Sequence, residues 1–399
     1  MSPTATAIEP AEFPWYDYSG YTFSLGLQVG KDAINSGHSG SAFDPEKGKP
    51  AIAGGMGEQA QVAYAKQEAI LAAAGLGFAD VTRVVENISI AGLPYYAEAK
   101  EVRERLFPHS PTVCTVVVDR LVRRQALIEV EVHASPGGGV ALVLGSDGTW
   151  RRETVRSGHD GAVYLPTLLP IDANGDVVAE GDVVGQYFYV VERAGELLQQ
   201  AGLDLSNLVS TVDYSTPATR ERYPKTGRAR KDLMGPVYPG AAGILMSQLH
   251  APGVLLALDA VASVHQPEKV NPGWDRYDTL TYNPGIRAGN TLYMSGFAAL
   301  DMETQAAVHP GDLRAQAEVT YDAMLQVMAE VGAGPEHLLT TVEYVTPDGL
   351  GDYRAVADVR RDKLRSPYPA STGIVCGGLL RDEFLLEVVP TALIPEADA

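Results

Sequence analysis

Residues 311–345 read GDLRAQAEVTYDAMLQVMAEVGAGPEHLLTTVEYV, and a recognisable copy of this stretch occurs three times in the chain. Each copy has a glycine, a glutamine five residues later, a second glycine sixteen residues after the glutamine, and an acid eleven residues after that. In chain order these residues are Gly54, Gln59, Gly75 and Glu86; Gly181, Gln186, Gly202 and Asp213; and Gly311, Gln316, Gly332 and Glu343. The second glycines are 127 and 130 residues apart. The chain is therefore predicted to consist of three units of about 130 residues.

The third copy is predicted to form a helix, a tight exit and then a strand. Four apolar residues fall at spacings that place them on one face of a helix, namely Leu313, Ala317, Met324 and Met328. Gly332 suits the end of that helix, because glycine adopts the left-handed conformation at little steric cost. The β-branched and aromatic run at residues 338–345 is typical of a strand. The repeated glutamine and glycines are therefore interpreted as structural residues.

Each unit is predicted to follow the order β-β-α-β-α-β-β, which makes the fold class α+β. The units are expected to span residues 18–134, 135–265 and 266–399. The first seventeen residues lack the basic start and the apolar stretch of a signal peptide, so they are expected to form a flexible N-terminal tail.

The composition narrows the function. The chain has 31 basic and 50 acidic residues and a net charge of −19, which opposes binding to nucleic acid or anionic membranes. No segment approaches the roughly 20 apolar residues of a membrane span. Cys114 and Cys376 show no metal-binding spacing and are expected to be reduced, buried thiols. A cytoplasmic protein that binds a small molecule, without a metal or other cofactor, is the expectation that remains.

Several blocks of the third unit resemble a known family. They are YNPGIRAGNTLYMSG at 282–296, the stretch at 311–345, SPYPASTG at 366–373 and LLEVV at 385–389. In these blocks the chain resembles the Rid family, also called the YjgF or endoribonuclease L-PSP family. Unit one is similar in every block, and unit two is a more degenerate copy.

This resemblance implies a chorismate-mutase-like fold and, because family members are usually homotrimers with a site in each cleft between subunits, one chain folded as a pseudo-trimer. Whether such pseudo-trimers pair further into dimers is left open. Chorismatases and cyanuric acid hydrolases are built on a similar threefold plan.

Family members that hydrolyse imines and enamines use a tyrosine, a Ser-Gly pair, a glutamate that holds the attacking water, and an arginine that binds the substrate carboxylate. The resemblance places the glutamate at Glu129, Ala257 and Glu387 in units one to three. It places the Ser-Gly pair at Ser36-Gly37, Leu165-Pro166 and Ser295-Gly296, and the tyrosine at Phe23, Arg151 and Tyr282. The family arginine is replaced by Val113, Ala241 and Ser371.

A single working cleft between units one and three follows if each site takes its glutamate from one unit and its Ser-Gly pair from a neighbour. One direction around the ring combines Glu387 with Ser36 and Gly37. The other direction combines Glu129 with Tyr282, Ser295 and Gly296, and we favour it because Phe23 has lost the hydroxyl that Tyr282 keeps.

The residue types suit acid/base chemistry. A glutamate at the mouth of an apolar strand is partly desolvated, which raises its pKa towards neutrality. The backbone N–H of Gly37 or Gly296 is expected to approach a substrate closely because no Cβ intervenes. His109 is a further candidate acid or base, although a loop histidine is more often a surface residue. Glu129 and Glu387 are alternatively solvated charges at strand ends, and the Ser-Gly pairs are alternatively β-bulges.

Loss of the family arginine puts the usual substrate in doubt, because a guanidinium grips a carboxylate with two hydrogen bonds. Arg120, Arg123 and Arg124 are most simply a solvated hairpin, although one of them could replace the missing anchor.

The first hypothesis is a cofactor-free Rid-like hydrolase or deaminase that acts on an imine, enamine or related C–N bond of a small metabolite in specialised biosynthesis. The alternatives are a chorismatase-like or ring-opening hydrolase or cyclase, and a non-catalytic ligand-binding or scaffold protein.

Overall fold

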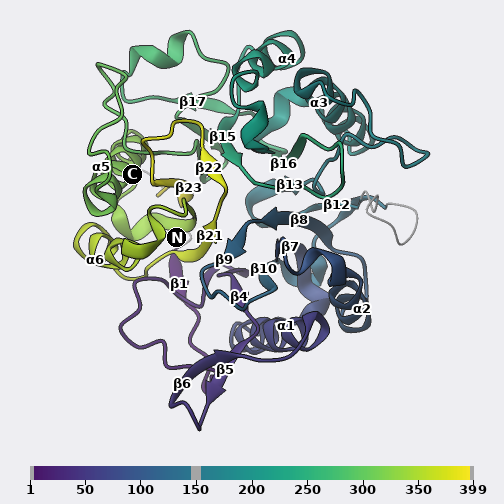
Figure 1. Ribbon diagram of the computed structural model, residues 1–399, viewed down its shortest axis with the longest axis vertical. Coiled ribbons are helices and arrows are strands. Elements are labelled where there is room, and N and C mark those ends of the chain that lie inside the picture. Colours follow the sequence, from purple (N-terminus) through teal and green to yellow (C-terminus); the bar gives the residue numbers. More distant parts are fainter. Residues whose placement is uncertain (1–3, 145–153, 396–399) are drawn as a thin grey trace.

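The computed structural model describes residues 4–144 and 154–395. Within these residues, three large sheets correspond to the three units, and each sheet is flanked by two helices (Figure 1). The last strand of every unit lies in the interior of its sheet, between the third strand and the strand that follows the long helix. The helices lie on the outside of the molecule and the strands lie towards its centre.

The same order of elements occurs three times. Unit one contains β1 (Ala5–Ala7), β2 (Gly26–Val29), β3 (Asp32–Asn35), α1 (Met56–Ala73), β7 (Val81–Ser89), α2 (Tyr96–Leu106), β8 (Thr112–Val118) and β10 (Ile128–Ala134). Unit two contains β11 (Ala141–Val143), β12 (Val155–Ser157), β13 (Ala162–Tyr164), α3 (Val183–Gln200), β14 (Leu208–Ser215), α4 (Gly227–Leu233), β15 (Gly240–Leu245) and β16 (Leu256–Ser263). Unit three contains β17 (Glu268–Val270), β18 (Gly285–Ala288), β19 (Thr291–Met294), α5 (Leu313–Ala329), β20 (Leu338–Val345), α6 (Arg354–Lys363), β21 (Ala370–Val375) and β23 (Leu386–Leu393).

The α+β class and the three tandem units are confirmed, with one additional edge strand at the start of each unit. In unit one this edge strand is β1, which lies within the expected flexible tail. That expectation is corrected, because β1 pairs with β2 and Ile8 is buried in the core of unit one. Residues 5–7 therefore belong to the first sheet. Short strands complete the fold, namely β4 (His38–Ser39), the hairpin of β5 (Ser41–Asp44) and β6 (Lys49–Ile52), β9 (Arg120–Leu121) and β22 (Gly378–Leu379).

The repeated glycines end the long helices as predicted. Gly75, Gly202 and Gly332 have φ of +73°, +79° and +72°, in the left-handed region that other residues avoid. The strand predicted at residues 338–345 is β20.

The repeated glutamine joins each long helix to the segment that enters the last strand. The Gln316 side chain donates to Glu383 O at 2.7 Å and accepts from the Leu385 N–H at 2.8 Å. Gln59 and Gln186 make the equivalent bonds to Leu127 N and Leu255 N at 2.8 and 2.7 Å. Each of these leucines stands two residues before the glutamate position of its unit. The glutamine thus fixes where the last strand begins.

The repeated acid is the centre of a buried polar network. Glu343 accepts from Tyr321 Oη at 2.5 Å, Tyr353 Oη at 2.5 Å and Arg360 Nη1 at 2.6 Å. Asp213 and Glu86 are surrounded in the same way by two tyrosines and one arginine. Because every carboxylate is paired and hydrogen-bonded, these charges are tolerated inside the fold.

The three units contact one another pairwise. The short strand β9 of unit one pairs with β21 of unit three, and β22 of unit three pairs with β15 of unit two. Ser247 N of unit two donates to Asp119 Oδ1 of unit one at 2.8 Å. All three pairs of units are therefore in contact within the described residues. Among the described residues, no helix is long and apolar enough to cross a membrane.

Arg360→Met tests the energetic role of the buried network. The substitution leaves the Glu343 carboxylate buried without its guanidinium, so we expect the free energy of unfolding to fall by about 3–5 kcal/mol. Denaturation in urea measures this change. Arg361→Met is the matched control, because Arg361 follows in the same helix and pairs with Asp358 on the surface; it should cost less than about 1 kcal/mol. Equal losses in the two variants would contradict the assignment.

Candidate active site

Each glutamate lies beside the Ser-Gly pair of its own unit. Glu129 on β10 is opposite Ser39 on β4, and a Cβ added at Gly37 would lie 2.6 Å from Glu129 Oε1. In unit three, a Cβ at Gly296 would overlap with Glu387 Oε1. The expectation that glutamate and Ser-Gly come from different units is therefore wrong. The last strand pairs with the segment after Ser-Gly in the same sheet, and this pairing brings them together.

The Ser-Gly pairs fasten one unit to the next. Ser295 Oγ donates to Asn283 O at 2.6 Å and accepts from Ala241 N of unit two at 2.9 Å. The Gly296 N–H donates to Ala241 O at 3.1 Å. The hydroxyl and the N–H are both used within the protein, so the predicted direct contacts of Ser295 and Gly296 with a substrate are not supported.

Unit one repeats this arrangement against unit three. Ser36 Oγ donates to Ser24 O at 2.6 Å and accepts from Ser371 N at 2.8 Å, while the Gly37 N–H donates to Thr372 Oγ1 at 3.0 Å. The glycine is needed for space, because a side chain there would displace the carboxyl group of Glu129. The position of the lost family arginine, occupied here by Ser371, does lie in this interface.

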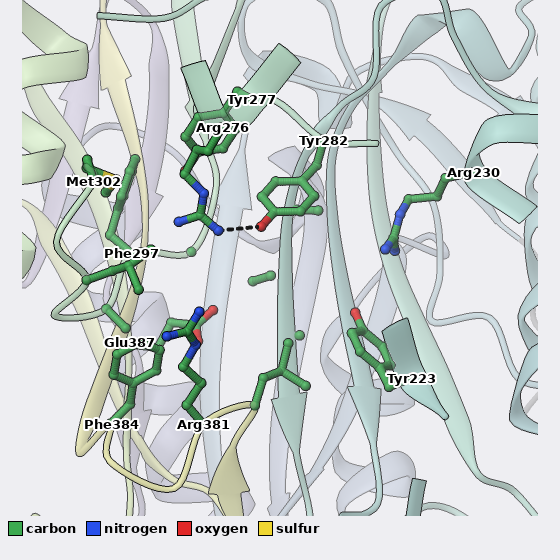
Figure 2. Close-up of a pocket in the computed structure, with 17 residues that line it drawn as sticks. Tyr223, Arg230, Arg276, Tyr277, Tyr282, Phe297, Met302, Arg381, Phe384 and Glu387 are labelled. Atoms are coloured by element: carbon green, nitrogen blue, oxygen red, sulfur yellow. Dashed lines mark hydrogen bonds between the residues drawn. The ribbon is translucent and has the colours of Figure 1, made fainter. Parts of the chain in front are cut away.

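A cavity of about 230 Å³ lies between units two and three (Figure 2). Unit three contributes Tyr282, Glu387 and the apolar side chains of Phe297, Met302 and Phe384. Unit two contributes Ala241 and Ala242 on β15, together with Tyr223 and Arg230. Tyr282 and Glu387 therefore share a cavity, as the family pattern requires, but their partner is unit two and not unit one.

Glu387 is the buried acid of this cavity. Its exposed fraction is 7%, and its carboxyl group makes no hydrogen bond to the described residues. Burial raises the pKa of Glu387 to about 8. Glu343, at a similar depth, has three partners, so the unsatisfied Glu387 contrasts with the structural acids of the same fold.

Three arginines line the cavity, and none of them was predicted as a site residue from the sequence. Arg230 is held by Asp213 and by Thr281 Oγ1 at 3.0 and 3.1 Å. Arg276, in the 3₁₀ helix Asp275–Asp278, donates to Tyr282 Oη at 3.4 Å, and its Nε is buried without a partner. Arg381 precedes β23 and donates to Gln305 O at 2.7 Å. A signal for Arg381 was present, because it stands six residues before Glu387, as Arg123 does before Glu129.

The interface between units one and three holds a second, half-buried acid, Glu129. Burial, and secondarily Glu131, raises the pKa of Glu129 to about 8, whereas burial lowers the pKa of the nearby Lys66 to about 7. Aromatic residues of the N-terminal segment pack here, and Tyr16 Oη lies 2.9 Å from His38 Nδ1 while its ring lies 5.2 Å from Lys66 Nζ. The aromatic N-terminal segment therefore packs beside Glu129.

The third interface, between units one and two, lacks the acid. Ala257 replaces the glutamate, and Cys114, next to Val113, lies with its Sγ 3.4 Å from Leu165 O. His250 Nε2 lies 2.9 Å from Thr115 O in the same interface. Val113 therefore belongs to an interface without a catalytic carboxyl group.

Two other predicted residues lie away from the Glu387 cavity. His109 Nε2 is 2.8 Å from Val81 O at the start of β7, whereas Glu129 is opposite Asn87 near the far end of that strand. Burial lowers the pKa of His109. Its contact with the backbone of β7 indicates a structural role. The Phe23 ring packs 5.0 Å from that of Tyr21 in unit one. Arg151, the matching position in unit two, lies outside the described residues.

Known proteins resemble this chain in sequence and in fold. A 2-iminobutanoate/2-iminopropanoate deaminase of Dermatophagoides farinae is 26% identical over 93 residues, which are 23% of this chain and 70% of that protein. The crystal structure of a chorismatase superposes with a TM-score of 0.51 at 15% identity, over 78% of this chain and 93% of that chain, a likeness that shows the fold alone. RidA from an Antarctic Psychrobacter species is 24% identical, with a TM-score of 0.27, over 29% of this chain and 90% of its own.

The family model described as endoribonuclease L-PSP matches residues 19–135 and 277–394, which are units one and three. Unit two, whose Ser-Gly and glutamate positions are changed, falls outside the match. Since the matched segments make up more than half of the chain, this protein belongs to the endoribonuclease L-PSP family, the family also called Rid or YjgF.

Proposed function

We propose that this protein hydrolyses the C=N bond of a small anionic imine, or of the enamine that tautomerises to it, in the cavity between units two and three. Glu387 acts as the general acid and base. The observation that carries the proposal is a buried carboxyl group without a protein partner, which faces a cavity that also contains guanidinium groups. A group that is left unsatisfied at this depth is available to a substrate and a water molecule.

Glu387 can carry every proton of this reaction. With a pKa of about 8 it is mostly protonated at neutral pH, so it can donate its proton to the imine nitrogen. The resulting carboxylate takes a proton from water as the water oxygen bonds to the carbon of C=N. The regained proton then goes to the amine nitrogen, the C–N bond breaks, and the hydroxyl proton returns to Glu387. Imine and water are thereby converted to a carbonyl compound and ammonia, with no net oxidation or reduction.

The family gives independent support for this class of reaction, since the mite relative is named for the deamination of 2-imino acids. A ribonuclease function is less favoured, because the chain carries a net charge of −19. A scaffold with decayed sites is also less favoured, because the Glu387 cavity combines an open volume with an unsatisfied acid.

The activities of Glu387→Gln and Glu129→Gln distinguish the two clefts. Imines generated in situ by amino-acid oxidases serve as substrates, and ammonia release is measured. We expect Glu387→Gln to lower kcat/KM by about 100-fold or more, because the proton carrier is lost. Glu129→Gln should retain most of the activity, since the N-terminal segment packs in its interface. Loss of activity in Glu129→Gln alone would move the reaction to the other cleft and overturn the assignment.

The pH dependence of stability tests the environment of Glu387 without any substrate. Between its ordinary pKa of 4.5 and its folded pKa of about 8, the folded protein holds a proton that the unfolded chain has lost. Its contribution to stability is therefore present below pH 4.5 and decreases as the pH rises towards 8, by up to about 1.4 kcal/mol per pH unit.

Glu387→Gln does not titrate, so its free energy of unfolding should rise relative to that of the wild type from pH 5 to pH 8. Urea denaturation at several pH values measures the difference. Glu383→Gln, which removes an exposed carboxylate four residues earlier, is the matched control for the loss of one negative charge. A constant difference for Glu387→Gln would show that its pKa is ordinary.

A further inference from the structure

The arginines of the Glu387 cavity differ in whether they already have an anionic partner. Arg230 forms an ion pair with Asp213 at 3.0 Å. Within the described part of the chain, Arg276 and Arg381 form no ion pair with a carboxylate; their hydrogen bonds go to Tyr282 Oη and to Gln305 O. The Nε of Arg276 is buried and unpartnered. In a chain with 50 acidic and 31 basic residues, two unpaired arginines in one cavity indicate an anionic ligand.

The two guanidinium groups enter the cavity from different segments. Arg276 comes from the 3₁₀ helix before β18, and Arg381 comes from the loop between β22 and β23 (Figure 2). In Figure 2 their side chains extend towards each other from opposite ends of the site, with the labelled Glu387 on the side of Arg381. A single carboxylate needs only one such group, whereas a ligand with an anionic group at each end would use both.

Comparison of the units within the chain separates the roles of the two arginines. The position six residues before the glutamate is Arg381 in unit three and Arg123 in unit one, but Ala251 in unit two, where the glutamate has become Ala257. The arginine is thus present where the acid is present and absent where the acid is absent. This pattern makes Arg381 the counterpart of the carboxylate anchor that the family keeps on another strand.

Arg276 is peculiar to unit three. Trp274 and Tyr277 share their spacing with Trp15 and Tyr18 of unit one, and this register places Asp17 where unit three has Arg276. An aspartate at that position would repel a second carboxylate. An arginine at this position therefore distinguishes the Glu387 cavity from the Glu129 interface.

We propose that the Glu387 cavity selects a dicarboxylic substrate, with one carboxylate on Arg381 and the other on Arg276. The choice of an imine as the reacting group rests on the proposed function, whereas the two anchors do not. The substrate class that follows is the imine of an acidic amino acid, such as a 2-iminosuccinate or 2-iminoglutarate. The reaction that supplies it is the two-electron oxidation of the amine of such an amino acid by a separate oxidase, with O2 as the electron acceptor, and hydrolysis releases the 2-oxo dicarboxylate and ammonia.

Equilibrium binding of unreactive carboxylates tests the two anchors directly. Succinate and glutarate are compared with butyrate and pentanoate by isothermal titration calorimetry at constant ionic strength. We expect the dicarboxylates to bind the wild type about tenfold more tightly or better, because each carboxylate gains a guanidinium partner. Arg276→Gln and Arg381→Gln should each remove this advantage, and Arg361→Gln, a surface change in α6, should keep it.

Folding of the variants is checked by thermal melting, and Arg276→Lys, which keeps the positive charge, should restore part of the preference. Equal affinity of the wild type for mono- and dicarboxylates, or a preference that survives Arg276→Gln, would overturn the proposal. The proposal would also be overturned if none of the four carboxylates bound to the wild type.

Activity separates this proposal from the proposed reaction. An aspartate oxidase supplies the dicarboxylic imine, and a leucine-active oxidase supplies a monocarboxylic one. Tight dicarboxylate binding with no hydrolysis of either imine would reject the reaction and keep the substrate class. Hydrolysis of both imines with equal kcat/KM, unaffected by Arg276→Gln, would keep the reaction and reject the dicarboxylate.

Discussion

The hydrogen bonds of the repeated glutamine are the constraint on which the site depends. In unit three, the Gln316 side chain on the buried face of α5 accepts a hydrogen bond from the backbone N–H of Leu385. Leu385 stands two residues before Glu387. A polar side chain buried in a helix is stable only with such partners, so the helix and the last strand cannot shift independently. The glutamine thus sets the register of β23, and that register delivers the Glu387 carboxyl group to the cavity wall.

The same constraint operates in all three units, but its product differs. Gln186 holds Leu255 just as firmly, although residue 257 is an alanine and no acid is delivered. The glutamine and the helix-ending glycine stabilise the fold whether or not the acid is present, which explains why unit two keeps both residues. Unit two still contributes to the Glu387 cavity, because Ala241 and Ala242 on its strand β15 line the side opposite Glu387.

The sequence contained much of the fold because its signals are local. The spacing from Gln316 to Gly332 fits one helix, and the β-branched run that follows fits β20, so these elements could be predicted residue by residue. The three-residue strand β1, with the sequence Ala-Thr-Ala, carries no such signal and is defined only by its pairing with β2. The partner of each glutamate was mispredicted because it depends on which strands pair within a sheet. Arg276 and Glu387 line the same cavity although 111 residues of chain separate them, and no local sequence pattern predicts this proximity.

The pairing of β9 with the sheet of unit three also has a consequence for the chain while it is being synthesised. Leu121 pairs with Ile374, so about 250 residues must follow before this short strand meets its partner. At roughly 5–20 residues per second the ribosome needs about 10 to 50 seconds for that stretch. During this interval the first unit presents a strand edge and apolar interface residues that nothing yet covers. Closure of the ring is therefore the last and most long-range step of folding, and the nascent chain is most exposed to aggregation before the third unit emerges.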